Sequence, residues 1–171
     1  MRVFALAVLL FVSASPIVDA AEPALAAKTE GDPAVRKQLD ELGYKYKVDS
    51  EGDYRLTFDM DEDGNGNGNG RSQLVFVRSP VEAYGTHKVR EVWSPGYQSE
   101  TDEFPATVAN RLLVATQDSK LGAWAKQGRY AVFVVKLPAG ATAGELDDAV
   151  DAALRSADEM EAELTPGKDE F

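Results

Sequence analysis

The stretch Leu121–Gly140, LGAWAKQGRYAVFVVKLPAG, decides the fold class of this chain of 171 residues. Strand-forming side chains fill residues 121–126 and 129–137, on either side of Gln127-Gly128. A glycine-containing dipeptide between two such runs is typical of a tight β-hairpin. Pro138 then ends the second run. The stretch therefore predicts two antiparallel strands that follow each other along the chain.

Three amphipathic helices are expected, over residues 32–43, 104–115 and 142–165. The first begins with the N-cap Asp32 and ends at Gly43, which is suited to a left-handed cap. Apolar residues recur in each helix at spacings of three and four, which is the period of a helix with one buried side. The apolar stripes are Val35, Leu39 and Leu42; Phe104, Val108, Leu112 and Ala115; and Leu146, Val150, Ala153, Leu154, Ala157, Met160 and Leu164.

Further strands are expected before the hairpin. Residues 44–48 look extended, residues 54–60 alternate between apolar and polar side chains, and residues 73–78 include an apolar run. Residues 87–93 also look extended, whereas Pro95-Gly96 and Pro105 are expected to bracket a loop. Because strands occur in runs, the predicted class is α+β, an antiparallel sheet packed by three helices in the order helix–strands–helix–strand hairpin–helix.

The apolar run Leu74–Val77 implies that the sheet is covered on both faces. Successive side chains of a strand point to opposite faces, so three helices on one face cover only half of this run. We expect Val75 and Val77 to lie on the other face, against a second subunit or a protein partner. A homodimer is the expected assembly.

Three aromatic residues are candidates for partner binding, namely Trp93, Tyr97 and Trp124. Aromatic side chains anchor many protein interfaces, and these three could line one groove for a peptide or protein. The alternative is packing in the core or at its rim, because tryptophan is usually well buried.

Several short motifs resemble the YbjN family, bacterial proteins with the fold of type III secretion chaperones. They are Ala109-Asn110-Arg111-Leu112-Leu113, Lys120–Trp124, Val132–Pro138 and the closing Asp158-Glu159, Leu164-Thr165 and Asp169–Phe171. The likeness covers residues 32–171 and implies a single YbjN-like domain. It also implies a fold that dimerises and holds extended peptide segments of partners, and it supplies no catalytic residues.

Residues 1–20 have the layout of a secretory signal peptide. An apolar run from Val3 to Val12 precedes Val18-Asp19-Ala20, whose outer residues suit a cleavage site. The run is shorter than the roughly 20 residues that span a bilayer, so no membrane span is expected in the mature chain. Residues 21–31 are interpreted as a linker, and the mature protein is expected in the periplasm or outside the cell.

The mature chain is expected to begin at Ala21. N-terminal sequencing of the protein from an envelope fraction tests this directly. Recovery of an intact Met1 would contradict export through a cleaved signal peptide.

Composition excludes several classes of site. The chain has no cysteine and one histidine, His87, so disulfides, thiolate sites and sites with two histidines are absent. A net charge of -11 argues against nucleic acid as a partner. His87 has no acid or nucleophile near it in the sequence pattern, and catalysis through it is not expected.

The segment 59–70 offers an alternative function. Asp59, Asp61, Asp63 and Gly64 match the first half of an EF-hand calcium loop, which would make a calcium-responsive envelope protein. Gly70 stands where the bidentate glutamate is required, and a long hairpin connection explains the same residues.

An uncharacterised hydrolase is the second alternative, with Asp61 and Asp63 as an acid–base pair. The pair lies in a glycine-rich loop without rigid support, which disfavours catalysis. The sequence therefore predicts a non-enzymatic, exported protein-binding or chaperone-like module without a cofactor, whose partners are peptides or envelope proteins.

Overall fold

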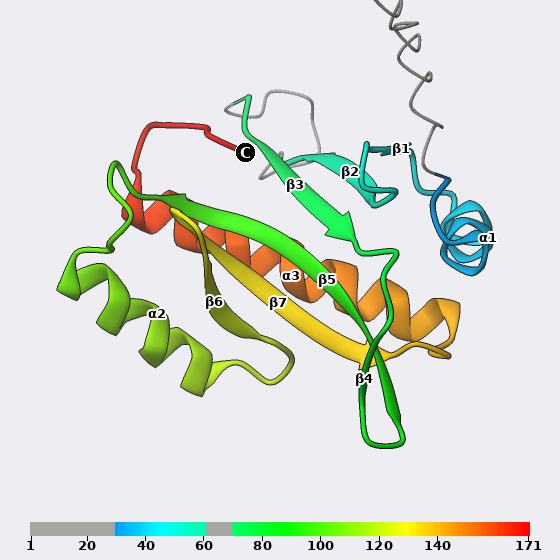
Figure 1. The fold of residues 1–171 in the computed structure, drawn as a ribbon. Coiled ribbons are helices and arrows are strands. Elements are labelled where there is room, and N and C mark those ends of the chain that lie inside the picture. The colour runs from blue at the N-terminus through cyan, green and yellow to red at the C-terminus, as the bar shows by residue number, and fades with distance from the viewer. Residues whose placement is uncertain (1–29, 61–69) are drawn as a thin grey trace, which may run out of the picture.

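A seven-stranded antiparallel sheet carries three helices on one face in the computed structural model, which describes residues 30–60 and 70–171 (Figure 1). The helices are α1 (Pro33–Leu42), α2 (Ala106–Asp118) and α3 (Ala143–Leu164). The strands are β1 (Tyr46–Val48), β2 (Tyr54–Asp59), β3 (Ser72–Val77), β4 (Glu82–Tyr84), β5 (His87–Gln98), β6 (Ala123–Gln127) and β7 (Tyr130–Pro138). The predicted class and the order helix–strands–helix–strands–helix are confirmed.

The sheet order is β1-β2-β3-β5-β7-β6, and β4 pairs with β5 outside this path. The hairpin expected around Gln127-Gly128 is confirmed, since β6 and β7 pair from Gln127 opposite Tyr130 to Ala123 opposite Val134. Helix α3 runs beneath β3, β5 and β7, while α1 lies at the β1 end and α2 at the β6 end (Figure 1). The sheet face opposite the helices is called the open face below.

Capping residues fix both ends of α1 and the start of α3 at the positions that the sequence predicts. The side chain of Asp32 accepts the N–H of Ala34 at 2.7 Å, and Gly43 ends α1 with a φ of 74°. Helix α3 begins with a capping box between Thr142 and Glu145. Helix α2 has no side-chain cap, and it starts two residues after Phe104, behind Pro105.

The expectation for Val75 and Val77 is wrong. Both side chains have 0% exposure and lie on the helix face, in one core cluster with Leu146 and Val150 of α3. Gln73 shares that face, fully buried, and donates to the Ser94 hydroxyl at 3.0 Å. The open face of β3 is therefore formed by Leu74 and Phe76, the other half of the run.

The loop expected between Pro95-Gly96 and Pro105 starts later than predicted, at Ser99, because Pro95 and Gly96 lie inside β5. A bulge between Pro95 and Tyr97 shifts the pairing of β5 with β7 and accommodates the proline. Gly96 lies against α3, and a Cβ there would come within 2.9 Å of the Ala157 carbonyl oxygen. The β4–β5 hairpin, with its turn at Gly85, is a further element that the sequence analysis did not predict.

The residues on either side of the connection between β2 and β3 pair as they do in a hairpin. Asp59 pairs with Ser72, and the Met60 N–H donates to the Arg71 carbonyl at 2.9 Å. Asp61 and Asp63 lie outside the described residues, as do residues 1–29, which contain the expected signal peptide and most of the linker. No helix among residues 30–60 and 70–171 is both long and apolar enough to cross a membrane.

Candidate functional site

The open face of the sheet carries a continuous apolar surface, called here the open-face patch. Two shallow grooves of about 380 and 360 Å³ meet on it, and Trp93 lines both. The patch comprises Leu74, Phe76, Trp93, Ala123 and Ala125, which are at least partly exposed, together with Pro95, Val132 and Val134, which are buried but line the grooves. All three described helices pack on the other face, so none of them covers this surface (Figure 1).

Charged neighbours hold Trp93 in place at the centre of the patch. Its indole N–H donates to Glu91 Oε2 at 2.8 Å, and Lys136 Nζ lies 3.0 Å from Glu91 Oε1. The Arg78 guanidinium lies 4.3 Å from the centre of the indole ring. A fixed tryptophan beside an arginine combines two of the residue types that most often dominate binding energy at protein interfaces.

The three predicted aromatic residues do not line one groove, so that expectation is wrong. Trp124 lies on the helix face, with its ring 5.4 Å from that of Phe133, and Tyr97 packs 5.7 Å from Phe104. Trp93 and Tyr97 would share a face in a regular strand, but the bulge after Pro95 turns them to opposite sides. Only Trp93 contributes to the open-face patch.

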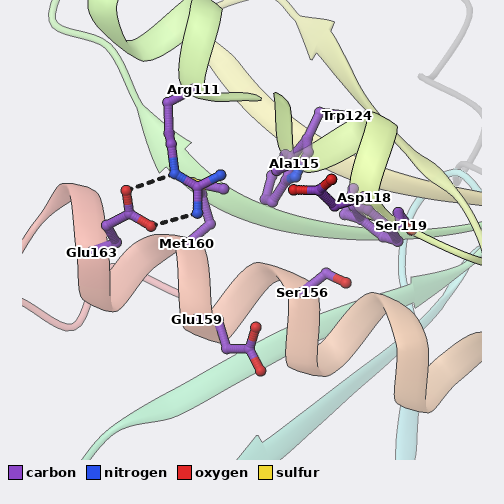
Figure 2. Close-up of a pocket in the computed structure, with 10 residues that line it drawn as sticks. Arg111, Ala115, Asp118, Ser119, Trp124, Ser156, Glu159, Met160 and Glu163 are labelled. Atoms are coloured by element: carbon purple, nitrogen blue, oxygen red, sulfur yellow. Dashed lines mark hydrogen bonds and ion pairs between the residues drawn. The ribbon is translucent and has the colours of Figure 1, made fainter. Parts of the chain in front are cut away.

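A third groove, of about 310 Å³, lies between α2 and α3 (Figure 2). Arg111 reaches across it to Glu163 with two nitrogen–oxygen distances of 2.7 Å. The hydrogen bond from Arg111 holds the pKa of Glu163 below its usual range. Because the arginine is already paired, the described residues of this groove offer no free cation to a ligand, and the other ionisable side chains that line it are Asp118 and Glu159.

A larger hollow, of about 850 Å³, lies between the 99–105 loop and the end of α3. The loop is held by its own hydroxyl groups, since Ser99 donates to the Glu103 carbonyl at 2.7 Å and Thr101 donates to it at 2.9 Å. Glu100, Glu103 and Glu170 line the hollow beside Arg129 and Lys168. Acids and bases are mixed there, so the hollow favours no single class of charged ligand.

The structure brings no catalytic set together among the residues it describes. His87 is exposed at the start of β5, next to the hairpin turn, and Asp59 is exposed at the end of β2. No group of three His, Asp or Glu side chains in residues 30–60 and 70–171 is placed to hold a metal ion. The calcium hypothesis stays a prediction, because it depends on Asp61 and Asp63.

A buried acid in α3 escaped the sequence analysis. Glu161 has 0% exposure, and burial raises the pKa of its carboxyl group. Its Oε1 accepts the N–H of Glu170 at 2.6 Å, and Arg71 Nη2 lies 3.9 Å from its Oε2. Glu161 follows Ala157 by four residues, so it lies on the apolar stripe of α3, and that spacing was the available signal.

The open-face patch is the candidate site that the geometry favours, since it is apolar, shallow and centred on a fixed tryptophan. No protein-family model matches the chain, and no curated protein is significantly similar to it in sequence.

Proposed function

We propose that this protein is a non-enzymatic protein-binding or chaperone-like module that holds extended segments of partner proteins on the open face of its sheet. The observation that carries the proposal is the open-face patch, in which Trp93, Phe76 and Leu74 form an apolar surface that none of the described helices covers. Covering such a surface releases about 25 cal/mol for each Å² of apolar area removed from water. Enzyme sites are usually deeper than these grooves, and Glu91 and Lys136, the ionisable groups beside Trp93, are paired with each other.

Membership in the YbjN family and a type III secretion chaperone-like fold are part of this proposal. They rest on the motifs named above, and the order helix–strands–helix–strands–helix supports them. Two motif positions have clear structural roles in this chain. Leu112 packs with Met160 between α2 and α3, and Gly122 lies directly against the ring of Phe133.

The proposed place of action is the periplasm or the exterior, on the strength of the apolar run and cleavage site in residues 1–20. Partners would then be envelope or secreted proteins, or a second copy of the chain. A second copy would meet Leu74 and Phe76 rather than Val75 and Val77, because the latter are in the core.

Replacement of Phe76 by Asp is expected to weaken binding of an unfolded polypeptide by about tenfold or more, the loss typical of an interface anchor. The probe is reduced and carboxymethylated α-lactalbumin, with binding measured by fluorescence anisotropy. Phe76 lies on the open face, so the charge disturbs the patch and spares the core.

Leu113→Asp is the matched control, since Leu113 is 67% exposed on α2, away from the open face. Equal loss in both variants, or no loss in either, would reject the open face as the site. Circular dichroism establishes that each variant is folded, and Leu74→Asp replaces Phe76→Asp if the latter unfolds. Sedimentation of the same variants shows whether a second copy uses this face.

A further inference from the structure

Strands β3 and β5 separate at one end and leave a wedge between them. They pair only at Phe76 with Trp93 and at Val77 with Val92. Continued along this register, Val75 would lie opposite Ser94 and Leu74 opposite Pro95, and proline has no N–H to donate. The ladder therefore stops, and β3 diverges from β5 towards Ser72 (Figure 1).

Hydrogen bonds from side chains of both strands replace the missing backbone hydrogen bonds between β3 and β5. The Ser94 hydroxyl donates to the Leu74 carbonyl at 2.6 Å, and the Gln73 amide donates to the Pro95 carbonyl at 2.7 Å. Beyond these bridges, the Ser72 N–H still points to the β5 side, where none of the described strands receives it. An unpaired strand edge beside an apolar surface is the arrangement that receives an added peptide in β-augmentation.

The chain's own residues Lys168–Phe171, called here the tail segment, occupy this wedge. The Ser72 N–H donates to Asp169 Oδ1 at 3.0 Å, and the Ser72 hydroxyl donates to the Phe171 backbone oxygen at 3.2 Å. The Phe171 ring meets Tyr130 edge-on at 6.2 Å and lines the same groove as Leu74. The segment ends near the start of β3 (Figure 1), and its Glu170 and Phe171 line the groove at this end of the open-face patch.

These contacts define a recognition pattern. A carboxylate accepts the strand-edge N–H of Ser72, and an aromatic ring two residues later reaches Tyr130 and the apolar groove. Charge-assisted hydrogen bonds and aromatic contacts are the two features that make such a short segment selective. Glu170 lies between Asp169 and Phe171, and its N–H donates to the buried carboxylate of Glu161. This hydrogen bond helps to hold the tail segment in place.

We propose that the wedge between β3 and β5 is a binding site for extended acidic–aromatic peptide segments, with Asp or Glu two residues before an aromatic residue, and that the tail segment occupies it as an intramolecular competitor. The inference deepens the proposed function and rests on it for the partner. A partner segment of this pattern displaces the tail segment and can then contact the whole open-face patch. Occupancy of the wedge by the tail in about nine-tenths of molecules would lower the apparent affinity for such a partner about tenfold.

The test uses the peptide Thr165–Phe171, TPGKDEF, as the probe, with two forms of the protein. One is the full chain, and the other ends at Gly167. Titrations followed by amide NMR are expected to shift the signals of Ser72, Gln73 and Tyr130 in the shortened chain, with saturation. The full chain should bind the peptide about tenfold more weakly, because its own segment competes.

Two controls make the result specific. The peptide TPGKDEA lacks the aromatic ring and is expected to cause no saturable shift. Phe171→Ala in the full chain keeps Asp169 and Glu170 but loosens the tail segment, so it should bind TPGKDEF more tightly than the wild type does. This variant also carries the test if the shortened chain fails to fold.

The proposal is overturned if the shortened chain gives no saturable shift, if TPGKDEA binds as well as TPGKDEF, or if the full and shortened chains bind equally. A shortened chain that dimerises and ignores the peptide would assign the wedge to a second copy, which also overturns it. The lactalbumin assay tests the proposed function separately, because it measures the contribution of Phe76 to binding and requires no acidic–aromatic segment. Equal binding by the wild type and Phe76→Asp would reject the proposed function.

Discussion

The Arg90→Met variant is expected to lose about 3–5 kcal/mol of unfolding free energy, the usual cost of removing one partner from a buried ion pair. Arg90 is 5% exposed, and its guanidinium lies 2.6 Å from the Asp32 carboxylate. It also donates to the carbonyl oxygens of Arg78 and Ser79, each at 2.8 Å. Methionine keeps much of the apolar volume but leaves these acceptors without a donor.

The effect extends to the first helix, because Asp32 is also the N-cap of α1. Urea denaturation measures the loss, and a fall in melting temperature on the order of 10 °C accompanies it for a domain of this size. Arg155→Met is the matched control, since its pair with Asp151 is exposed and contributes little. Similar losses in the two variants would contradict the importance of burial for Arg90.

Acid titration checks the same contact. Burial opposes ionisation of Asp32, yet hydrogen bonds from Arg90 and the Ala34 N–H hold its pKa below the ordinary value of 3.8. A carboxyl group with a lowered folded-state pKa stabilises the fold above its unfolded value, and this contribution is lost as pH falls through the folded pKa. The stability of the wild type should therefore fall more steeply below about pH 4 than that of Arg90→Met.

Local signals predicted the helices and the β6–β7 hairpin. Asp32, Gly43 and Thr142 act at short range, through caps that involve residues within a few positions, and the structure confirms all three. Gly128 gives the β6–β7 turn its positive φ of 57° for the same reason. Such features depend little on the rest of the chain, so the sequence alone is sufficient to identify them.

The orientation of β3 could not be predicted in this way. Its four consecutive apolar residues give no preference for either face, and the buried Gln73 points the wrong way for a simple polarity rule. Gln73 is acceptable in the core only because Ser94 and Pro95 accept its amide hydrogens. That compensation comes from another strand, more than twenty positions along the chain.

The candidate site was predicted only in part, for a related reason. A partner-binding sheet face was expected at Val75 and Val77, and Trp93 was expected in a groove with Tyr97 and Trp124, while Pro95 was interpreted as the start of a loop. In the structure Pro95 remains in β5 and instead ends the pairing with β3, which opens the wedge. Whether Pro95 ends β5 or lies within it depends on β7, because β5 continues to pair with β7 on both sides of the bulge at Pro95.

The second large effect is expected at Gly122, where replacement by Ala should cost about 2–4 kcal/mol, from backbone strain and overpacking together. Gly122 has a φ of 89°, which residues with a Cβ rarely adopt. A Cβ there would lie 2.5 Å from Phe133 Cε1 and 2.9 Å from the Val134 carbonyl oxygen. Phe133 is 1% exposed and cannot move aside without disturbing the core beneath β7.

Gly128→Ala separates the two causes, because Gly128 also has a positive φ, of 57°, but no described atom outside its chain neighbours lies within 4 Å of the position that a Cβ would take. It should therefore lose only the strain, about 1–2 kcal/mol. Urea denaturation of both variants, with equal slopes, gives the difference that belongs to the contact with Phe133. Equal losses at the two glycines would show that Phe133 yields easily, and that Gly122 is required for its backbone conformation alone.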